Sequence, residues 1–139
     1  MHQRPAGLIV LTGFFALGAI IASVTGVALR WPGTVLEPMW RLNPQAHTAF
    51  LGMGGWAVPL MVVVAAACAL AAVGIWRRAW WGQRLALGLL AVNLVGDAMN
   101  ALILGDLRTL IGLPIGGVLI VYLLSKDVRA HFSTTKAAA

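Results

Sequence analysis

The residues most capable of chemistry lie within one long apolar stretch, where Asp97 stands between Asn93 and Asn100. Spacings of four and three residues place these side chains on one face of a helix. A carboxylate inside a membrane span is costly unless it is paired, protonated or hydrated, so Asp97 is a candidate ion-, proton- or ligand-binding residue. The same pattern is also typical of residues that hold membrane helices together by hydrogen bonds. With either role, we expect the three side chains to point together into a helical bundle.

Ser23, Thr25 and His47 are further candidate binding residues, because we expect them near the membrane depth of Asp97. A helix broken between Gly52 and Pro59 would expose backbone groups at the same level. We therefore predict that these groups form one polar pocket that opens outward. His47 follows a proline-initiated helix start, where a histidine is more often a polar residue of the helix end than a ligand.

Several kinds of chemistry are disfavoured by the residue inventory. The chain has three histidines, of which His2 and His131 lie in the terminal segments, so no pair within the spans can ligate a haem. Its single cysteine, Cys68, cannot form an internal disulfide and is expected to pack. Asp106 follows Asp97 by about nine residues, roughly 13 Å along a helix, which is too far for a shared aspartyl mechanism. We expect no enzyme, no metal and no cofactor.

Composition places these residues in a membrane protein. Of the 139 residues, 60% are hydrophobic and 10% charged, and the mean hydropathy is +0.90. A soluble domain carries about a quarter charged residues. The net charge of +6 comes from short connections between apolar stretches, without a basic stripe interleaved with aromatic residues, so we exclude nucleic acid as a partner.

The apolar stretches predict an all-α membrane protein, a four-transmembrane-helix bundle within a single membrane domain of residues 1–139. The uncharged segment 44–76 would be about 50 Å long as one straight helix, more than the hydrocarbon core needs. Glycines in its first half favour a break, although tilt of an unbroken helix is the alternative. The predicted spans are residues 5–29, 56–76 (preceded by a kinked or interfacial segment 44–55), 84–104 and 109–125.

Two of these spans carry small residues every four positions, which allow close helix packing. They are Gly18, Ala22 and Gly26 in the first span, and Gly112 and Gly116 in the fourth.

The distribution of positive charge predicts that both the N and C termini are cytoplasmic. Seven of the ten Lys and Arg then lie inside, namely Arg4, Arg77, Arg78, Arg84, Lys126, Arg129 and Lys136. This bias favours a single orientation over dual insertion. We expect the basic and aromatic residues on this side to contact lipid headgroups: Arg77, Arg78, Trp80, Trp81, Arg84, Lys126 and Arg129.

The preferred function is that of an accessory, assembly or interaction subunit, which packs with itself or with another membrane protein in the lipid bilayer. The alternative is a small oligomeric channel or transporter with Asp97 as the ion- or proton-binding site.

In size the chain resembles small multidrug-resistance transporters and dual-topology fluoride channels. The multidrug family uses a glutamate in its first helix, whereas the first span here has no acid. We expect the protein in a bacterial inner (cytoplasmic) membrane.

Overall fold

The computed structural model describes residues 6–105 and 110–137, which contain helices and no strand. The described part of the chain is therefore all-α, as the sequence predicts. Some of the residues used above lie outside the described residues: His2, Arg4, Pro5, Asp106, Thr109 and the side chains of His131 and Lys136.

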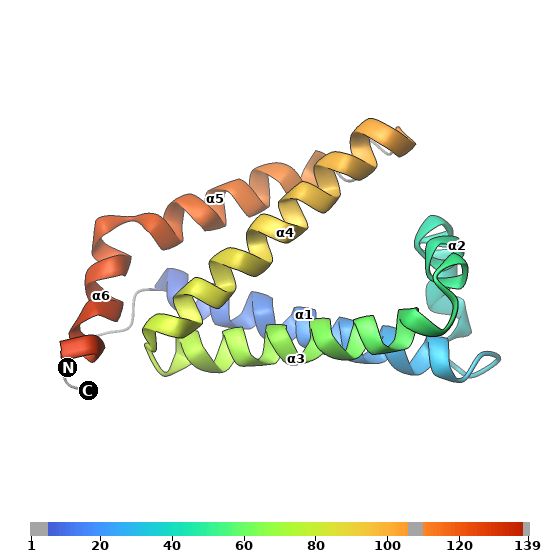
Figure 1. Cartoon of the computed structure of the whole chain (residues 1–139), viewed down its shortest axis with the longest axis horizontal. Coiled ribbons are helices and arrows are strands. Elements are labelled where there is room, and N and C mark those ends of the chain that lie inside the picture. Colours follow the sequence, from blue (N-terminus) through green and yellow to red (C-terminus); the bar gives the residue numbers. More distant parts are fainter. Residues whose placement is uncertain (1–5, 106–109, 138–139) are drawn as a thin grey trace. The chain divides into compact units, whose positions relative to one another are not determined.

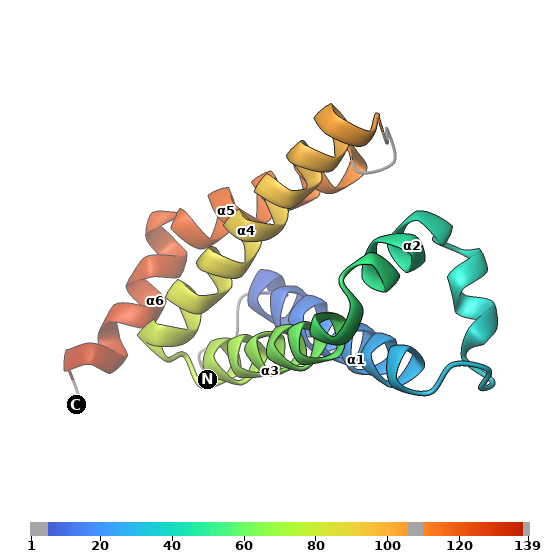
Figure 2. The same ribbon diagram turned by 45° about the vertical axis from the view of Figure 1, so that its right-hand side comes forward.

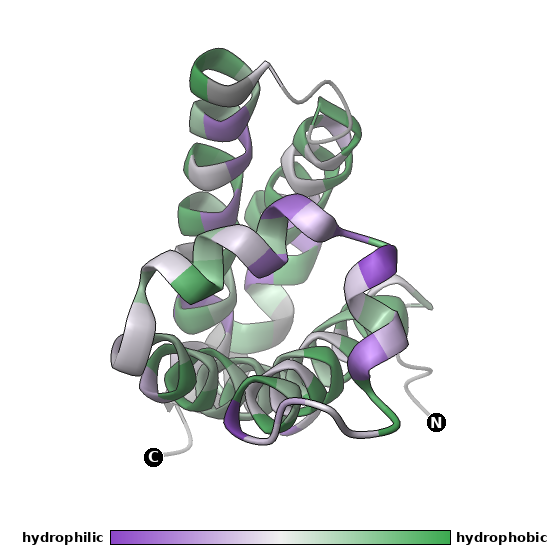
Figure 3. Cartoon of the chain, turned by 90° about the vertical axis from the view of Figure 1, so that its right-hand side faces the viewer, coloured by the Kyte–Doolittle hydropathy of each residue, from purple (hydrophilic) through white to green (hydrophobic). Residues whose placement is uncertain are grey.

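The helical elements follow one another with short connections (Figure 1). They are α1 (Ala6–Arg30), η1 (Glu37–Arg41), α2 (Pro44–Gly52), η2 (Gly54–Trp56), α3 (Ala57–Trp76), α4 (Trp80–Leu104), α5 (Gly112–Leu124) and α6 (Lys126–Ala137). In Figure 3 the long helices are mostly coloured as hydrophobic.

Three helical stretches are long and apolar enough to cross a membrane: Ala6–Arg30, Gly54–Trp76 and Trp80–Ile103. The apolar helix α5 has 13 residues, which at 1.5 Å per residue is about 20 Å, shorter than a hydrocarbon core of about 30 Å. The structure therefore shows three candidate spans where the sequence predicted four.

The segment predicted to be kinked or interfacial is a separate short helix. The side chain of Asn43 accepts a hydrogen bond from the backbone N–H of Ala46 at 3.0 Å and so caps the start of α2. The helix ends at Gly52, and Gly54 has φ +56°, a left-handed conformation that glycine adopts without steric penalty. The backbone is thus redirected between α2 and α3, instead of continuing as one tilted helix.

The described residues form two compact units, each considered by itself. Unit 1 comprises Met1–Phe15 and Leu70–Ala139, and unit 2 comprises Ala16–Ala69. The prediction of a single membrane domain stays a prediction. The largest fully buried side chains all belong to unit 1: Leu11, Ile75, Leu123 and Phe132.

Within unit 1, α4 and α5 run side by side and antiparallel (Figures 1 and 2). Gln83 at the start of α4 donates a hydrogen bond from Nε2 to the backbone oxygen of Leu123 at the end of α5, at 2.7 Å. At the other end of the pair, Asp97 of α4 lies against Gly112, the first residue of α5. The contact between the two helices is thereby fixed at both ends.

The segment after the fourth predicted span, where we expected only that Lys126 and Arg129 contact headgroups, forms helix α6 beside the α4–α5 pair. Val128 and Phe132, one helical turn apart, are 3% and 1% exposed, whereas Lys126, Asp127 and Arg129 are exposed. This apolar pair at spacing i, i+4 makes α6 an amphipathic helix that buries one face in unit 1.

Helices α3 and α4 meet at a tight turn that depends on two glycines. A Cβ added to Gly74 would lie 2.5 Å from the Cα of Gly82, so the two backbones are in direct contact. Between them, Arg78 adopts φ 57°, an uncommon left-handed conformation for a residue with a side chain.

Candidate functional site

The carboxylate of Asp97 occupies the space that a side chain at position 112 would need. A Cβ built on Gly112 would overlap its Oδ2 atom. The same oxygen accepts a hydrogen bond from Nδ2 of Asn93 at 3.2 Å, one turn earlier on α4. Asp97 therefore has a polar neighbour on its own helix and a glycine from the next helix, and its side chain is half-buried.

Position 112 is also the first residue of α5, which follows a 3₁₀ turn at residues 110–111, and no side chain caps this helix at Ile111. The helix dipole places partial positive charge at this end, so a carboxylate there is stabilised. Asp97 precedes the end of α4 at Leu104 by seven residues, about 10 Å along the helix axis. Asp97 thus lies beside the first residue of α5, at a helix end that favours an anion.

Of Asn93, Asp97 and Asn100, which were predicted to point together into the bundle, only Asp97 is covered by α5 within unit 1. Both asparagines are exposed, and only Asp97 is half-buried. Helix α5 covers the side of α4 that carries Leu94 and Asp97. Successive residues of a helix are rotated by about 100° around its axis, so Asn93 and Asn100 lie at the edge of this contact.

Gly96 lies on the same exposed edge of α4. It stands three residues after Asn93 and four before Asn100, is exposed, and has no heavy atom of a neighbouring group within 4 Å of an added Cβ. The face Asn93–Gly96–Asn100 therefore combines two amides with a position that permits close approach of another backbone. The sequence showed the two amides, but not that Gly96 lies open between them.

The other predicted binding residues lie in unit 2. Ser23 is exposed and donates to the backbone oxygen of Ala19 at 2.8 Å, while Thr25 is 7% exposed within α1. The ring of His47 stacks on the ring of Trp40, with centroids 4.4 Å apart, which joins α2 to η1. A pocket that unites these residues with Asp97 involves both units and stays a prediction.

The small residues predicted to pack helices lie at helix contacts within each unit. In unit 2, a Cβ on Gly18 would lie 3.6 Å from Sγ of Cys68, and one on Gly26 would lie 3.4 Å from Cβ of Met61. Ala22, between them, is 6% exposed.

In unit 1, the fourth predicted span presents its small residues to α4. Gly112 meets Asp97, and a Cβ on Gly116 would lie 3.0 Å from Cδ1 of Leu94. Both members of this pair therefore face the helix that carries the carboxylate.

The residues predicted to bind lipid headgroups lie in the α3–α4 turn, at the start of α4 and on α6. Arg84 places its guanidinium over the ring of Trp80, 4.6 Å from the centroid. Arg78 is half-buried, and the remaining members are exposed: Arg77, Trp80, Trp81, Arg84, Lys126 and Arg129. Because α5 ends beside Gln83, the turn and the start of α6 lie at the same end of the α4–α5 pair.

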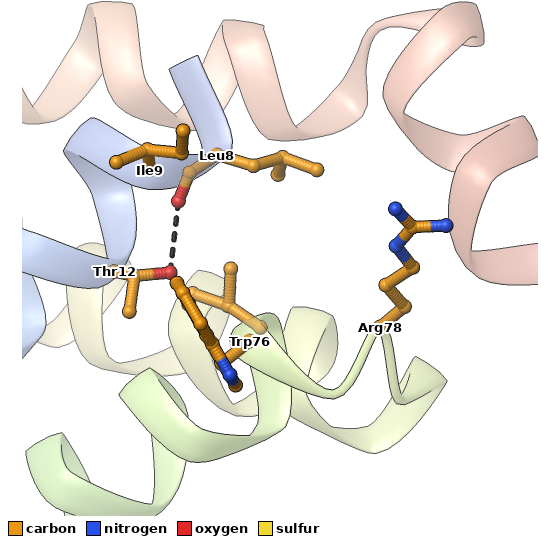
Figure 4. A pocket seen from close by; sticks show the side chains of 6 residues that line it. Leu8, Ile9, Thr12, Trp76 and Arg78 are labelled. Atoms are coloured by element: carbon orange, nitrogen blue, oxygen red, sulfur yellow. Dashed lines mark hydrogen bonds between the residues drawn. The ribbon is translucent and has the colours of Figure 1, made fainter. Parts of the chain in front are cut away.

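A small hollow in unit 1 is lined by residues of α1, the end of α3 and the turn that follows it (Figure 4). Its volume is about 10 Å³, which is at most room for one water molecule. Its one polar contact in the figure is internal, since the hydroxyl of Thr12 donates to the backbone oxygen of Leu8 at 2.8 Å. This hollow is a packing defect and not a ligand site.

A much larger groove, of about 440 Å³, lies in unit 2 between α1 and α3. Of the residues that line it, Ala22 and Gly26 were predicted to pack helices and Ser23 to bind a ligand. Among residues 6–105 and 110–137, no group of three or more His, Cys, Asp or Glu side chains is placed to hold a metal ion.

Comparison with protein-family models, curated proteins and solved structures finds no match to this chain.

Proposed function

We propose that this protein is a small membrane subunit that acts through helix packing, and that it associates with a second copy of itself through the Asn93–Gly96–Asn100 face of α4. The observation that carries the proposal is the exposure of both asparagines on a helix long and apolar enough to span a membrane. The side chain of Asn93 donates one hydrogen bond to Asp97, but each amide also has further donor and acceptor groups, and those that face hydrocarbon without hydrogen-bond partners are costly. Another helix on this face supplies them.

A second copy is the partner that this face suits best. An amide carries both donors and an acceptor, so two asparagines pair with each other without a complementary charge. A symmetric dimer brings the same patch of both subunits together. Both copies share one orientation because of the charge bias, so α4 meets α4 in parallel with Gly96 near the crossing point.

The proposal includes four crossings with both termini in the cytoplasm. Four crossings leave seven Lys and Arg inside and three outside. Three crossings would move Lys126, Arg129 and Lys136 outside, which leaves 7 − 3 = 4 inside and 3 + 3 = 6 outside. The positive-inside rule therefore favours four. The hydrogen bond between Gln83 and Leu123 supports this, since it brings the end of α5 back to the beginning of α4.

In this account α5 is a short fourth crossing that starts below the membrane surface, beside Asp97. The carboxylate serves as a structural anion at the first turn of α5 and does not bind a transported ion. The exposed basic residues of the α3–α4 turn and of α6 then face the cytoplasmic headgroups, as expected for an inner-membrane protein.

Cross-linking in membranes tests the dimer. With Cys68→Ala to remove the native thiol, the variant Asn100→Cys is oxidised in proteoliposomes, and Val95→Cys, exposed on another side of α4, is the matched control. A disulfide needs Cα atoms about 4.4–6.8 Å apart. The proposal expects a covalent dimer for Asn100→Cys and a much lower yield for Val95→Cys. Equal yields for the two variants contradict it.

The alternative function is a small oligomeric channel or transporter that uses Asp97 as its ion- or proton-binding site. The specific observation in its favour is a half-buried carboxylate inside an apolar helix. Proton or cation flux into liposomes is measured for wild type and Asp97→Asn. Flux in wild type that is lost in Asp97→Asn supports transport, whereas background flux in both rules out Asp97-dependent conduction.

A further inference from the structure

The groove of unit 2 has a volume within the range of known ligand sites. Its volume of about 440 Å³ falls within the roughly 300–1,000 Å³ of small-molecule pockets. Four small residues on α1 and α3 line the groove, namely Ala22, Ser23, Gly26 and Ala65. Larger apolar residues form its sides: Val27, Val58, Met61 and Val62. Val27 and Val62 are 44% and 61% exposed, so the groove opens to its surroundings.

One end of the groove carries a positive charge. Arg30, the last residue of α1, and the adjacent Trp31 line this end. The guanidinium of Arg30 lies 5.6 Å from the centroid of the Trp31 ring. None of the ten residues that line the groove is acidic. The carboxylate of Glu37, the first acidic residue after α1, accepts a hydrogen bond from the backbone N–H of Gly33 at 2.8 Å.

We propose that this groove binds one anionic phospholipid, with an acyl chain between α1 and α3 and the phosphate beside Arg30. The proposal is independent of dimer formation through α4. An open apolar groove on candidate membrane spans faces acyl chains, and an arginine with a tryptophan at the helix end lies where headgroups begin. An arginine pairs well with phosphate through a forked set of N–H donors. The combination of an open apolar groove and a cationic end is complementary to a phospholipid.

The test uses the full chain in a neutral detergent, titrated with phosphatidylglycerol or with phosphatidylcholine of the same chains. Native mass spectrometry measures the fraction of protein with one lipid bound. Wild type is expected to bind phosphatidylglycerol about fivefold more tightly, because one arginine near an anionic headgroup contributes about 1 kcal/mol. Equal affinity of wild type for the two lipids overturns the proposal.

Two pairs of variants locate the site. Arg30→Gln is expected to abolish the preference for phosphatidylglycerol, whereas Arg41→Gln, exposed on η1, keeps it. Ala65→Phe, which fills the groove, is expected to weaken binding of both lipids. Ala66→Phe, on the next position of α3 and outside the groove, leaves binding unchanged.

The controls separate binding from folding and from other occupants. Circular dichroism measures the helix content of each variant. If Ala65→Phe fails to fold, the comparison of Arg30→Gln with Arg41→Gln alone tests whether the lipid binds in this groove. An equal loss of the preference in both arginine variants overturns the site. A change in subunit number on Ala65→Phe without a change in lipid binding also overturns it, because it would identify a second copy as the occupant.

Discussion

The contact between Asp97 and Gly112 predicts a large effect from the smallest possible substitution, Gly112→Ala. The added Cβ overlaps the carboxylate oxygen of Asp97, so α4 and α5 must separate or the carboxylate must leave its position. Overpacking of this kind costs about 1–3 kcal/mol. Gly117→Ala is the matched control, since its Cβ meets no heavy atom within 4 Å. Alanine is favoured over glycine in a helix by up to about 1 kcal/mol, so Gly117→Ala is expected to be neutral or stabilising.

The assay is unfolding in dodecyl maltoside with increasing SDS, followed by far-ultraviolet circular dichroism. Gly112→Ala is expected to be about 1–3 kcal/mol less stable than Gly117→Ala. The difference should persist in an Asp97→Asn background, where the side chain keeps its shape, and should vanish in Asp97→Ala, where the space is free. Equal stability of the two alanine variants in the wild-type background refutes the contact, as does a difference that survives in Asp97→Ala.

Three further substitutions examine other contacts in unit 1 by the same unfolding assay. Gly74→Ala drives a Cβ into the backbone of α4, so we expect it to prevent folding or to destabilise strongly, unlike Gly88→Ala, which meets nothing within 4 Å. Gln83→Leu leaves the carbonyl of Leu123 without its 2.7 Å hydrogen bond, at a cost of about 1–3 kcal/mol; unchanged stability would show that this bond does not hold α5. Phe132→Ala removes a side chain only 1% exposed and should cost about 3–5 kcal/mol, with faster proteolysis of α6; resistance equal to wild type would contradict its docking.

Much of the helical arrangement follows from the sequence because its causes are local. Length and hydropathy indicate the three long helices, and the prolines and glycines near residues 44–55 indicate the interruption before α3. The fourth helix was predicted to be longer than the structure shows, since apolar composition alone does not reveal where a helix starts. Helix α6 was not predicted, because Val128 and Phe132 form a face too short to stand out among polar neighbours.

The candidate site could be predicted only in part. The spacing of Asn93, Asp97 and Asn100 places them near one another on one helix, but which of them is covered depends on the position of α5, and that is a tertiary contact. The pairing of Asp97 with Gly112 likewise joins residues distant in sequence. A glycine in an apolar stretch indicates close packing without identifying the neighbour, so the partner of Gly74 was also missed.

The most direct test of the proposed function is a count of subunits in the membrane. The chain is labelled with one dye at its C-terminus, reconstituted at low density in liposomes, and its photobleaching steps are counted. The account predicts two steps for wild type and for Gly88→Leu, and one step for Gly96→Leu, in which the side chain blocks the α4 face. Single steps for folded wild type, or two steps for Gly96→Leu, would contradict it.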